Sequence, residues 1–320
     1  FVSALTAAEW LRGPQPRRPA NLHLQERQVR QARYAAWSVT GMLILLGLVA
    51  GVAVLAPISG PGQPEQVAAQ PLPSAEEFAR NWYRFRGPQG AGISPHTDIP
   101  TDWDGPSGKG VLWKTRIPLP GKNSPIVWGD RVFVSGAEQG RSQVYCLDLQ
   151  TGRMLWTGEV PMASQEGLQV MEETGLAACT MATDGARVYA IFATGDLAAF
   201  HLDGKRAWHK SLGMPDSAYG YASSLETFGG RVLVQFDQGH GEDNRSKVLA
   251  LDGPTGRLVW EKARPVGGSW TSPIVARVGG AFQLVTVANP WVIAYDPNQG
   301  DEIWKASVAA GVLALFMREL

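Results

Sequence analysis

Residues 146–156, CLDLQTGRMLW, form a segment that the chain repeats, and this repeat decides the fold. A close copy occupies residues 250–260 (ALDGPTGRLVW), and a third occupies residues 294–304 (AYDPNQGDEIW). In these three copies an Asp precedes the final Trp by eight residues. A fourth copy, residues 199–208 (AFHLDGKRAW), is one residue shorter and has a His seven residues before the Trp. The recurrence indicates one supersecondary unit that is used several times.

Each copy has the composition of two strands joined by a turn. A small residue ends a run of β-branched and aromatic residues, which predicts a strand. The Asp and the Thr-Gly pair predict a tight turn, in which the Asp accepts backbone N–H groups and the glycine adopts a positive φ angle. A second strand carries the Trp inward, where its indole needs a small neighbour and a partner for its N–H.

The tryptophans give the period of the repeat. They are 43, 52, 52 and 44 residues apart, and they are Trp113, Trp156, Trp208, Trp260 and Trp304. The first of them has the strand but not the preceding turn. These separations match one four-stranded blade per repeat. We therefore expect the tryptophans to be structural wedges between blades of an all-β protein.

The pattern A-x-D-x-x-T-G-x-x-x-W resembles the tryptophan-docking motif of the quinoprotein-like (PQQ-like) β-propellers, from about Asn81 to Lys305. That superfamily includes PQQ-dependent alcohol dehydrogenases and a propeller lipoprotein of the outer-membrane assembly machinery, and this chain resembles the lipoprotein more than the enzymes. The opening of the repeat region, residues 82–88 (WYRFRGP), is similar to a W-x-x-F-R-G-P opening in the family. The resemblance implies about four blades here, as part of an eight-bladed ring.

The sequence before the repeats predicts a membrane anchor. Residues 1–33 form an arginine-rich arm, and residues 34–58 form an apolar segment without charged residues, long enough to cross a bilayer as one α-helix. Residues 59–80 read as a linker rich in proline and glycine. The positive-inside rule places the arm in the cytoplasm and the propeller in the periplasm, with the anchor in the inner membrane. A cleaved signal peptide is the alternative.

The repeats occupy residues 81–306. An atypical apolar tail follows them at residues 307–320. It contains neither turn residues nor another docking motif. An open arc of four blades exposes strand edges. We therefore expect that the natural protein is longer, or that a partner chain covers the open side.

The overall composition excludes several classes of function. Lys and Arg number 29, as do Asp and Glu, so the formal net charge is zero and no nucleic-acid partner is expected. With 37 glycines and 18% charged residues, the chain suits a turn-rich all-β domain. The five histidines occur in no H-x-x-x-H or H-E-x-x-H pattern, so we predict no metal site.

One polar position recurs when the blades are aligned. It opens the innermost strand of each blade, and it is occupied by Ser124, Thr180, Ser224 and Ser272. One interpretation is a ring of hydroxyl groups that lines the central channel for a ligand or water. The other, which we favour, is local capping of backbone groups, repeated by symmetry.

A polar loop between two strands of the third blade is a candidate interaction site. Its residues are His240, Glu242, Asp243 and Asn244, which would bind a partner or a cation. The alternative is a solvated hairpin tip.

The resemblance to PQQ dehydrogenases implies a calcium site of Glu, Asn and Asp, a catalytic Asp and two adjacent cysteines. This chain has no adjacent cysteines. Cys146 occupies the small-residue position of the docking motif, which indicates a buried thiol, whereas a bridge to Cys179 stays open as an alternative. We predict no catalytic residues and no cofactor, PQQ with calcium being the alternative. The expected function is a non-catalytic scaffold subunit of a membrane protein complex, and the competing hypothesis is a membrane-anchored quinoprotein dehydrogenase.

Overall fold

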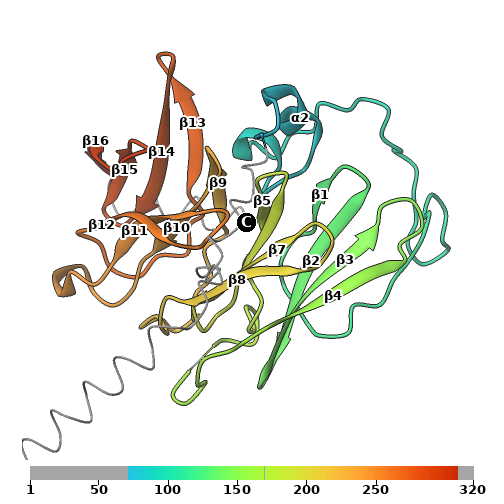
Figure 1. Ribbon diagram of the computed structural model, residues 1–320, viewed down its shortest axis with the longest axis horizontal. Helices are drawn as coiled ribbons and strands as arrows, with labels where there is room; N and C mark the ends of the chain where they lie inside the picture. Colours follow the sequence, from blue (N-terminus) through green and yellow to red (C-terminus); the bar gives the residue numbers. More distant parts are fainter. Residues whose placement is uncertain (1–70, 169, 309–320) are drawn as a thin grey trace, which may run out of the picture. The chain divides into compact units, whose positions relative to one another are not determined.

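The computed structural model describes residues 71–168 and 170–308. These residues contain four antiparallel sheets of four strands each, and every sheet is built from strands that are consecutive in the sequence. Figure 1 shows the four sheets in chain order, with their first strands toward the short helix α2 (Ala75–Arg80). The prediction of all-β, four-stranded blades is confirmed.

Each blade consists of four strands. Blades 1 and 2 comprise β1 (Ile126–Trp128), β2 (Arg131–Glu138), β3 (Arg141–Asp148), β4 (Met154–Val160), β5 (Ala182–Thr183), β6 (Arg187–Ile191), β7 (Asp196–His201) and β8 (Arg206–Ser211). Blades 3 and 4 comprise β9 (Glu226–Phe228), β10 (Arg231–Phe236), β11 (Lys247–Asp252), β12 (Leu258–Ala263), β13 (Ile274–Val278), β14 (Ala281–Ala288), β15 (Trp291–Tyr295) and β16 (Glu302–Ser307). Two short 3-10 helices, η2 (Pro88–Gly90) and η3 (Gly241–Asp243), complete the elements of the described residues.

The repeated segment forms the third and fourth strands of each blade. The small residue pairs directly with the Trp across the two strands, as Cys146 does with Trp156 and Ala250 with Trp260. The register shifts immediately after the small residue in all four blades. The turn between the strands is capped as predicted, since the Oδ1 of Asp148 accepts the backbone N–H of Thr151 at 2.8 Å.

The hydrophobic core lies between the sheets. One cluster joins blades 1 and 2 through Phe133 and Phe200, and corresponding clusters join the second blade to the third and the third to the fourth. Both phenylalanines are at most 1% exposed, and full burial of such a side chain contributes about 1.5–3 kcal/mol. Packing between blades, rather than within one blade, therefore holds the arc together.

One predicted strand is absent from the described residues. Residues 111–117 around Trp113 belong to no strand, and no described strand pairs with them. The helix predicted at residues 34–58 and the arm at residues 1–33 lie outside the described residues, as do most of the linker and of the apolar tail. Within the described part, no helix is long and apolar enough to cross a membrane.

Candidate functional site

Four of the five docking tryptophans donate a hydrogen bond to the turn between the third and fourth strands of the blade that follows them. The Nε1–H of Trp156 donates to the carbonyl of Leu202 at 2.9 Å, and that of Trp208 donates to the carbonyl of Gly253 at 2.7 Å. Trp113 and Trp260 make the corresponding bonds with Leu149 and Pro297. Trp304 differs, because its Nε1–H donates to Gln283 of its own blade, and the indole is 39% exposed.

The recurring hydroxyl groups also act between blades. The backbone N–H of Ser124 donates to Oγ1 of Thr180 at 3.1 Å, that of Thr180 to Oγ of Ser224 at 3.2 Å, and that of Ser224 to Oγ of Ser272 at 3.0 Å. The hydroxyl groups of Thr180, Ser224 and Ser272 thus each accept from the equivalent residue one blade earlier. The hydroxyl groups therefore cap backbone N–H groups, in the neighbouring blade rather than locally.

The segment that opens the repeat region accepts hydrogen bonds from backbone N–H groups in the first strands of blades 1 and 2. The carbonyl of Trp82 accepts the N–H of Val127 in blade 1 at 2.8 Å, and the carbonyl of Tyr83 accepts the N–H of Thr183 in blade 2 at 3.0 Å. Val127 and Thr183 stand three residues after Ser124 and Thr180. Two successive carbonyls of one segment therefore cap the same position in two successive blades.

In blades 3 and 4, one carboxylate caps that position. The two oxygens of Glu226 accept the N–H groups of Thr227 and Val275, each at 2.9 Å. Arg84 forms a buried ion pair with the same carboxylate and donates to the carbonyl of Pro273 at 3.2 Å. Burial raises the pKa of Glu226, and the positive charge of Arg84 opposes that rise. Residues 82–84 are thereby tied, directly or through Glu226, to all four blades.

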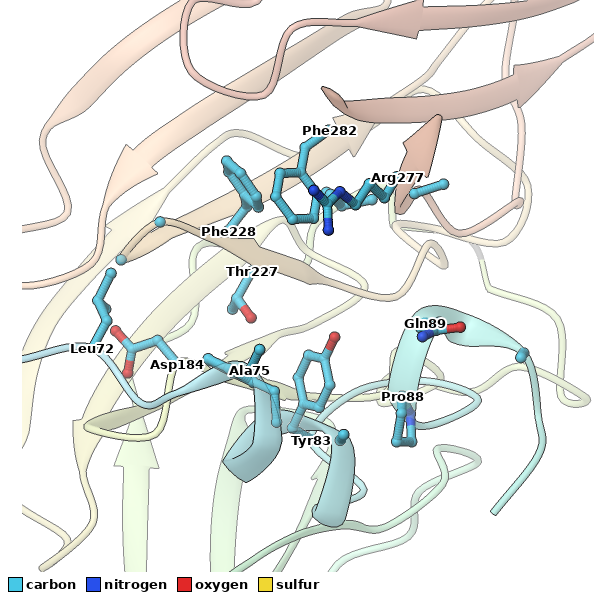
Figure 2. A pocket seen from close by; sticks show the side chains of 17 residues that line it. Leu72, Ala75, Tyr83, Pro88, Gln89, Asp184, Thr227, Phe228, Arg277 and Phe282 are labelled. Carbon is cyan, nitrogen blue, oxygen red and sulfur yellow. The ribbon is translucent and has the colours of Figure 1, made fainter. Parts of the chain in front are cut away.

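A cavity of about 690 Å³ lies between α2 and the first strands of blades 3 and 4. Figure 2 shows Phe228 and Phe282 on one side of it and Tyr83 on the other, with the phenol hydroxyl pointing into the space. Arg277 lies over the ring of Phe282, 5.9 Å from its centroid. The cavity is concave and mostly apolar with a few polar groups, which is the usual character of a small-molecule site.

The candidate loop of blade 3 is part of a connected surface. Its 3-10 turn is capped, since Asp243 Oδ2 accepts the N–H of His240 at 2.9 Å, and Glu242 and Asn244 are exposed beside it. The loop is bonded to both neighbouring connections, because the N–H of Gly239 donates to the carbonyl of Asp216 and the carbonyl of Gly239 accepts the N–H of Gly268.

An aromatic pair lies on these neighbouring connections. Tyr219 and Trp270 meet edge to face at 4.6 Å between centroids, and Trp270 is 37% exposed. The Nε1–H of Trp270 donates to Oγ of Ser217 at 3.2 Å, which fixes the indole on the connection of residues 212–225. We call residues 216–219, 239–245 and 268–270 the loop surface.

The two cysteines are free and buried in different core clusters. Burial raises the pKa of the Cys146 thiol to about 12. Cys179 also has a raised pKa, again because of burial, and its thiol donates to the carbonyl of Tyr221 at 3.3 Å. Both side chains therefore have the properties of structural thiols, and the open question of a bridge between them is answered by separate, unbridged positions.

No three His, Cys, Asp or Glu side chains gather at one place within residues 71–168 and 170–308. The buried carboxylates near the inner strands are already engaged, Glu226 by Arg84 and Asp184 by Arg187 at 2.9 Å.

Sequence reasoning missed the groups at the centre of the arc. Glu226 carried one signal, a charged residue two positions after Ser224 inside a predicted buried strand. Arg84 stood in the recognised opening segment, but nothing in the sequence paired two residues 142 positions apart. Phe228, Arg277 and Phe282 lie beside the glycine pairs at 229–230 and 279–280 and carried no functional signal.

One curated protein is similar to more than half of this chain. The outer membrane protein assembly factor BamB of Alkalilimnicola ehrlichii is 31% identical over 189 residues, which are 58% of this chain and 43% of that protein. This chain thus spans less than half the length of the curated relative that it matches.

Solved structures share parts of the chain at low identity. The similarity to BamB from Moraxella catarrhalis extends over 61% of this chain and 54% of the BamB chain, with 16% identity and a TM-score of 0.43. The similarity to the quinohemoprotein alcohol dehydrogenase of Comamonas testosteroni extends over 59% of this chain and 35% of the dehydrogenase chain, with 18% identity and a TM-score of 0.46. The family model of the outer membrane protein assembly factor BamB matches residues 101–239 and 244–318, about two thirds of the sequence, and the chain therefore belongs to the BamB family of PQQ-like propeller repeats.

Proposed function

We propose that this chain is a non-catalytic scaffold subunit of a membrane protein complex. Membership of a family named for an assembly factor is the observation that carries the proposal. The blades support it, because indole, hydroxyl and backbone bonds between neighbouring blades fix the relative positions of the loops that the arc presents. A rigid scaffold binds a partner with a small loss of conformational entropy.

The loop surface is the part that we assign to the partner. It combines an exposed aromatic anchor, Trp270, with the exposed carboxylate of Glu242. The carboxylates of Asp216 and Asp243 on the same surface are paired with Arg245. Tyr and Trp dominate the binding energy of protein interfaces. The connections are already bonded to one another, so the surface is ordered before a partner arrives.

The anchor and the location are part of the same proposal. Residues 34–58 cross the inner membrane once, with the N-terminus in the cytoplasm and the propeller in the periplasm, and they contact lipid and other subunits. The arginines before residue 34 and the lack of Lys or Arg at residues 59–79 support this orientation. The docking positions of Trp113 and Trp304 support further blades of a larger ring.

Purification of the full chain from native membranes in a mild detergent tests the scaffold role. A stoichiometric partner is expected, and Trp270→Ala should reduce its recovery at least tenfold, whereas Trp103→Ala, which removes an indole that is 67% exposed on a different loop, should not. A chain that purifies alone with the absorbance of a bound quinone would instead establish the dehydrogenase alternative.

A further inference from the structure

The cavity beside α2 is separate from the loop surface. It is bounded by the segment that opens the repeat region and by the first strands of the later blades. Its volume of about 690 Å³ falls within the range of small-molecule sites, about 300–1,000 Å³. Its charges and its apolar walls indicate the chemistry of an occupant.

The walls are apolar on two sides. Phe228 and Phe282 come from neighbouring blades and lie 5.1 Å apart between ring centroids, tilted against each other. Leu72 and Phe78 face the cavity from the N-terminal side, and Leu72 is 52% exposed. Burial of a compact apolar group against these side chains removes apolar surface from water on both partners.

The charge of the cavity is positive. Asp184 lines it, but its carboxylate accepts from Arg187 at 2.9 Å and from the hydroxyl of Tyr189 at 2.6 Å, so that its charge is compensated. Arg277 has no acidic partner among the described residues, and its guanidinium donates only one hydrogen bond there, to the carbonyl of Gly280 at 3.3 Å. Stacking on Phe282 restricts the guanidinium while leaving its other donors free.

A second donor lies across the cavity. The hydroxyl of Tyr83 points into the space, as Figure 2 shows. Burial raises the pKa of Tyr83, so the phenol keeps its proton at neutral pH and is able to donate it in a hydrogen bond.

We propose that this cavity binds a small amphipathic carboxylate, with its apolar body packed against Phe228, Phe282 and Phe78 and its carboxylate on Arg277. An arginine is suited to this role because its donors match the two oxygens of a carboxylate. The hydroxyl of Tyr83 donates to a polar atom of the same ligand. A bound ligand joins the N-terminal segment to blades 3 and 4.

A series of probes with one body and different head groups tests the proposal on the full chain. The probes are 4-phenylbutanoate, 4-phenylbutan-1-ol and 4-phenylbutylammonium, and ligand-observed NMR titration measures their dissociation constants. The carboxylate should bind at least tenfold more tightly than the alcohol, and the ammonium should bind most weakly, because a hydrogen bond to a charged partner is worth about tenfold or more.

Two variants and a matched control locate the binding. Arg277→Gln should raise the dissociation constant of 4-phenylbutanoate at least tenfold and change that of the alcohol by no more than twofold. Phe282→Ala should weaken both probes by about the same factor. Arg257→Gln removes an exposed arginine from a docking turn and should change neither. No binding to the unaltered chain, equal affinity for the three head groups, or binding that is insensitive to both cavity variants would each overturn the proposal.

Discussion

The indole of Trp208 fills the space that a β-carbon on Gly256 would need. A Cβ built on Gly256 would lie 2.6 Å from Cδ2 of that ring, closer than real Cβ contacts come. The same relationship holds between successive blades for Trp113 and Gly152, Trp156 and Gly204, and Trp260 and Gly300. The glycine of the docking turn therefore serves two purposes, since its φ of 68° closes the turn and its missing side chain admits the indole of the preceding blade.

Gly256→Ala should destabilise the protein by about 3 kcal/mol or more, because the strain of a positive φ adds to a clash with a buried ring. Gly279→Ala is the matched control, since Gly279 has a similar φ of 59° and open space where its Cβ would stand. The control should lose only about 1–2 kcal/mol. Urea denaturation followed by tryptophan fluorescence measures both, and equal losses would show that the indole does not require the glycine.

Trp260→Ala and Trp304→Ala should differ although both residues hold the same position in the repeat. Trp260 is 8% exposed and docks on the turn of blade 4, so its truncation should cost about 3–5 kcal/mol. Trp304 is 39% exposed and bonds only to its own blade among the described residues, so its loss in this chain should be about 1 kcal/mol. A loss at Trp304 as large as that at Trp260 would mean that another part of the chain covers it.

The repeat made the blades predictable because its information is local. The separation of Asp148 from Trp156 defines two strands and a turn, and four such units fix the sheet order. Contacts between blades were harder to predict from the sequence. The hydroxyl of Thr180 was identified by alignment, but its partner lies 56 residues away at Ser124, where no local pattern points.

The candidate site was still less predictable. The cavity is formed by residues that come together only when the N-terminal segment folds into the arc, such as Tyr83 and Arg277. Trp113 shows the opposite error of a local prediction. The sequence around it predicts a strand, but no described strand pairs with it. Long-range partners, rather than local propensity, decide both cases.

Arg84 and Glu226 should behave as a coupled pair. Arg84→Met leaves a buried carboxylate without its cation, and Glu226→Gln leaves a buried guanidinium without its anion, so each single change should cost about 3–5 kcal/mol. In the double variant no charge is buried, and the Gln oxygen still accepts one of the two backbone N–H groups. The double variant should therefore be more stable than either single variant in urea denaturation, whereas additive losses would show that the ion pair is not formed.

The thiol of Cys146 should be unreactive in the folded protein. Its pKa of about 12 keeps it protonated at neutral pH, and its side chain is fully buried. Iodoacetamide should label neither Cys146 nor Cys179 in buffer within the time that labels both in urea, as intact mass reports. Rapid labelling of the native chain would contradict the burial, and a mass unchanged in urea without reductant would reveal a bridge.

The ionisation of Glu226 should contribute to the pH dependence of the free energy of unfolding. Folding raises the pKa of this carboxyl above its usual value of 4.5, mainly through burial, so the native state holds the proton more tightly than the unfolded chain. Ionisation of Glu226 therefore lowers the free energy of unfolding, and this loss develops as the pH rises from below 4.5 through the raised pKa. Glu226→Gln does not titrate there, so the stability of the unaltered protein relative to this variant should fall over that interval. Urea denaturation of both proteins at a series of pH values measures the difference, and a relative stability that rises with pH would mean that Arg84 outweighs the cost of burial.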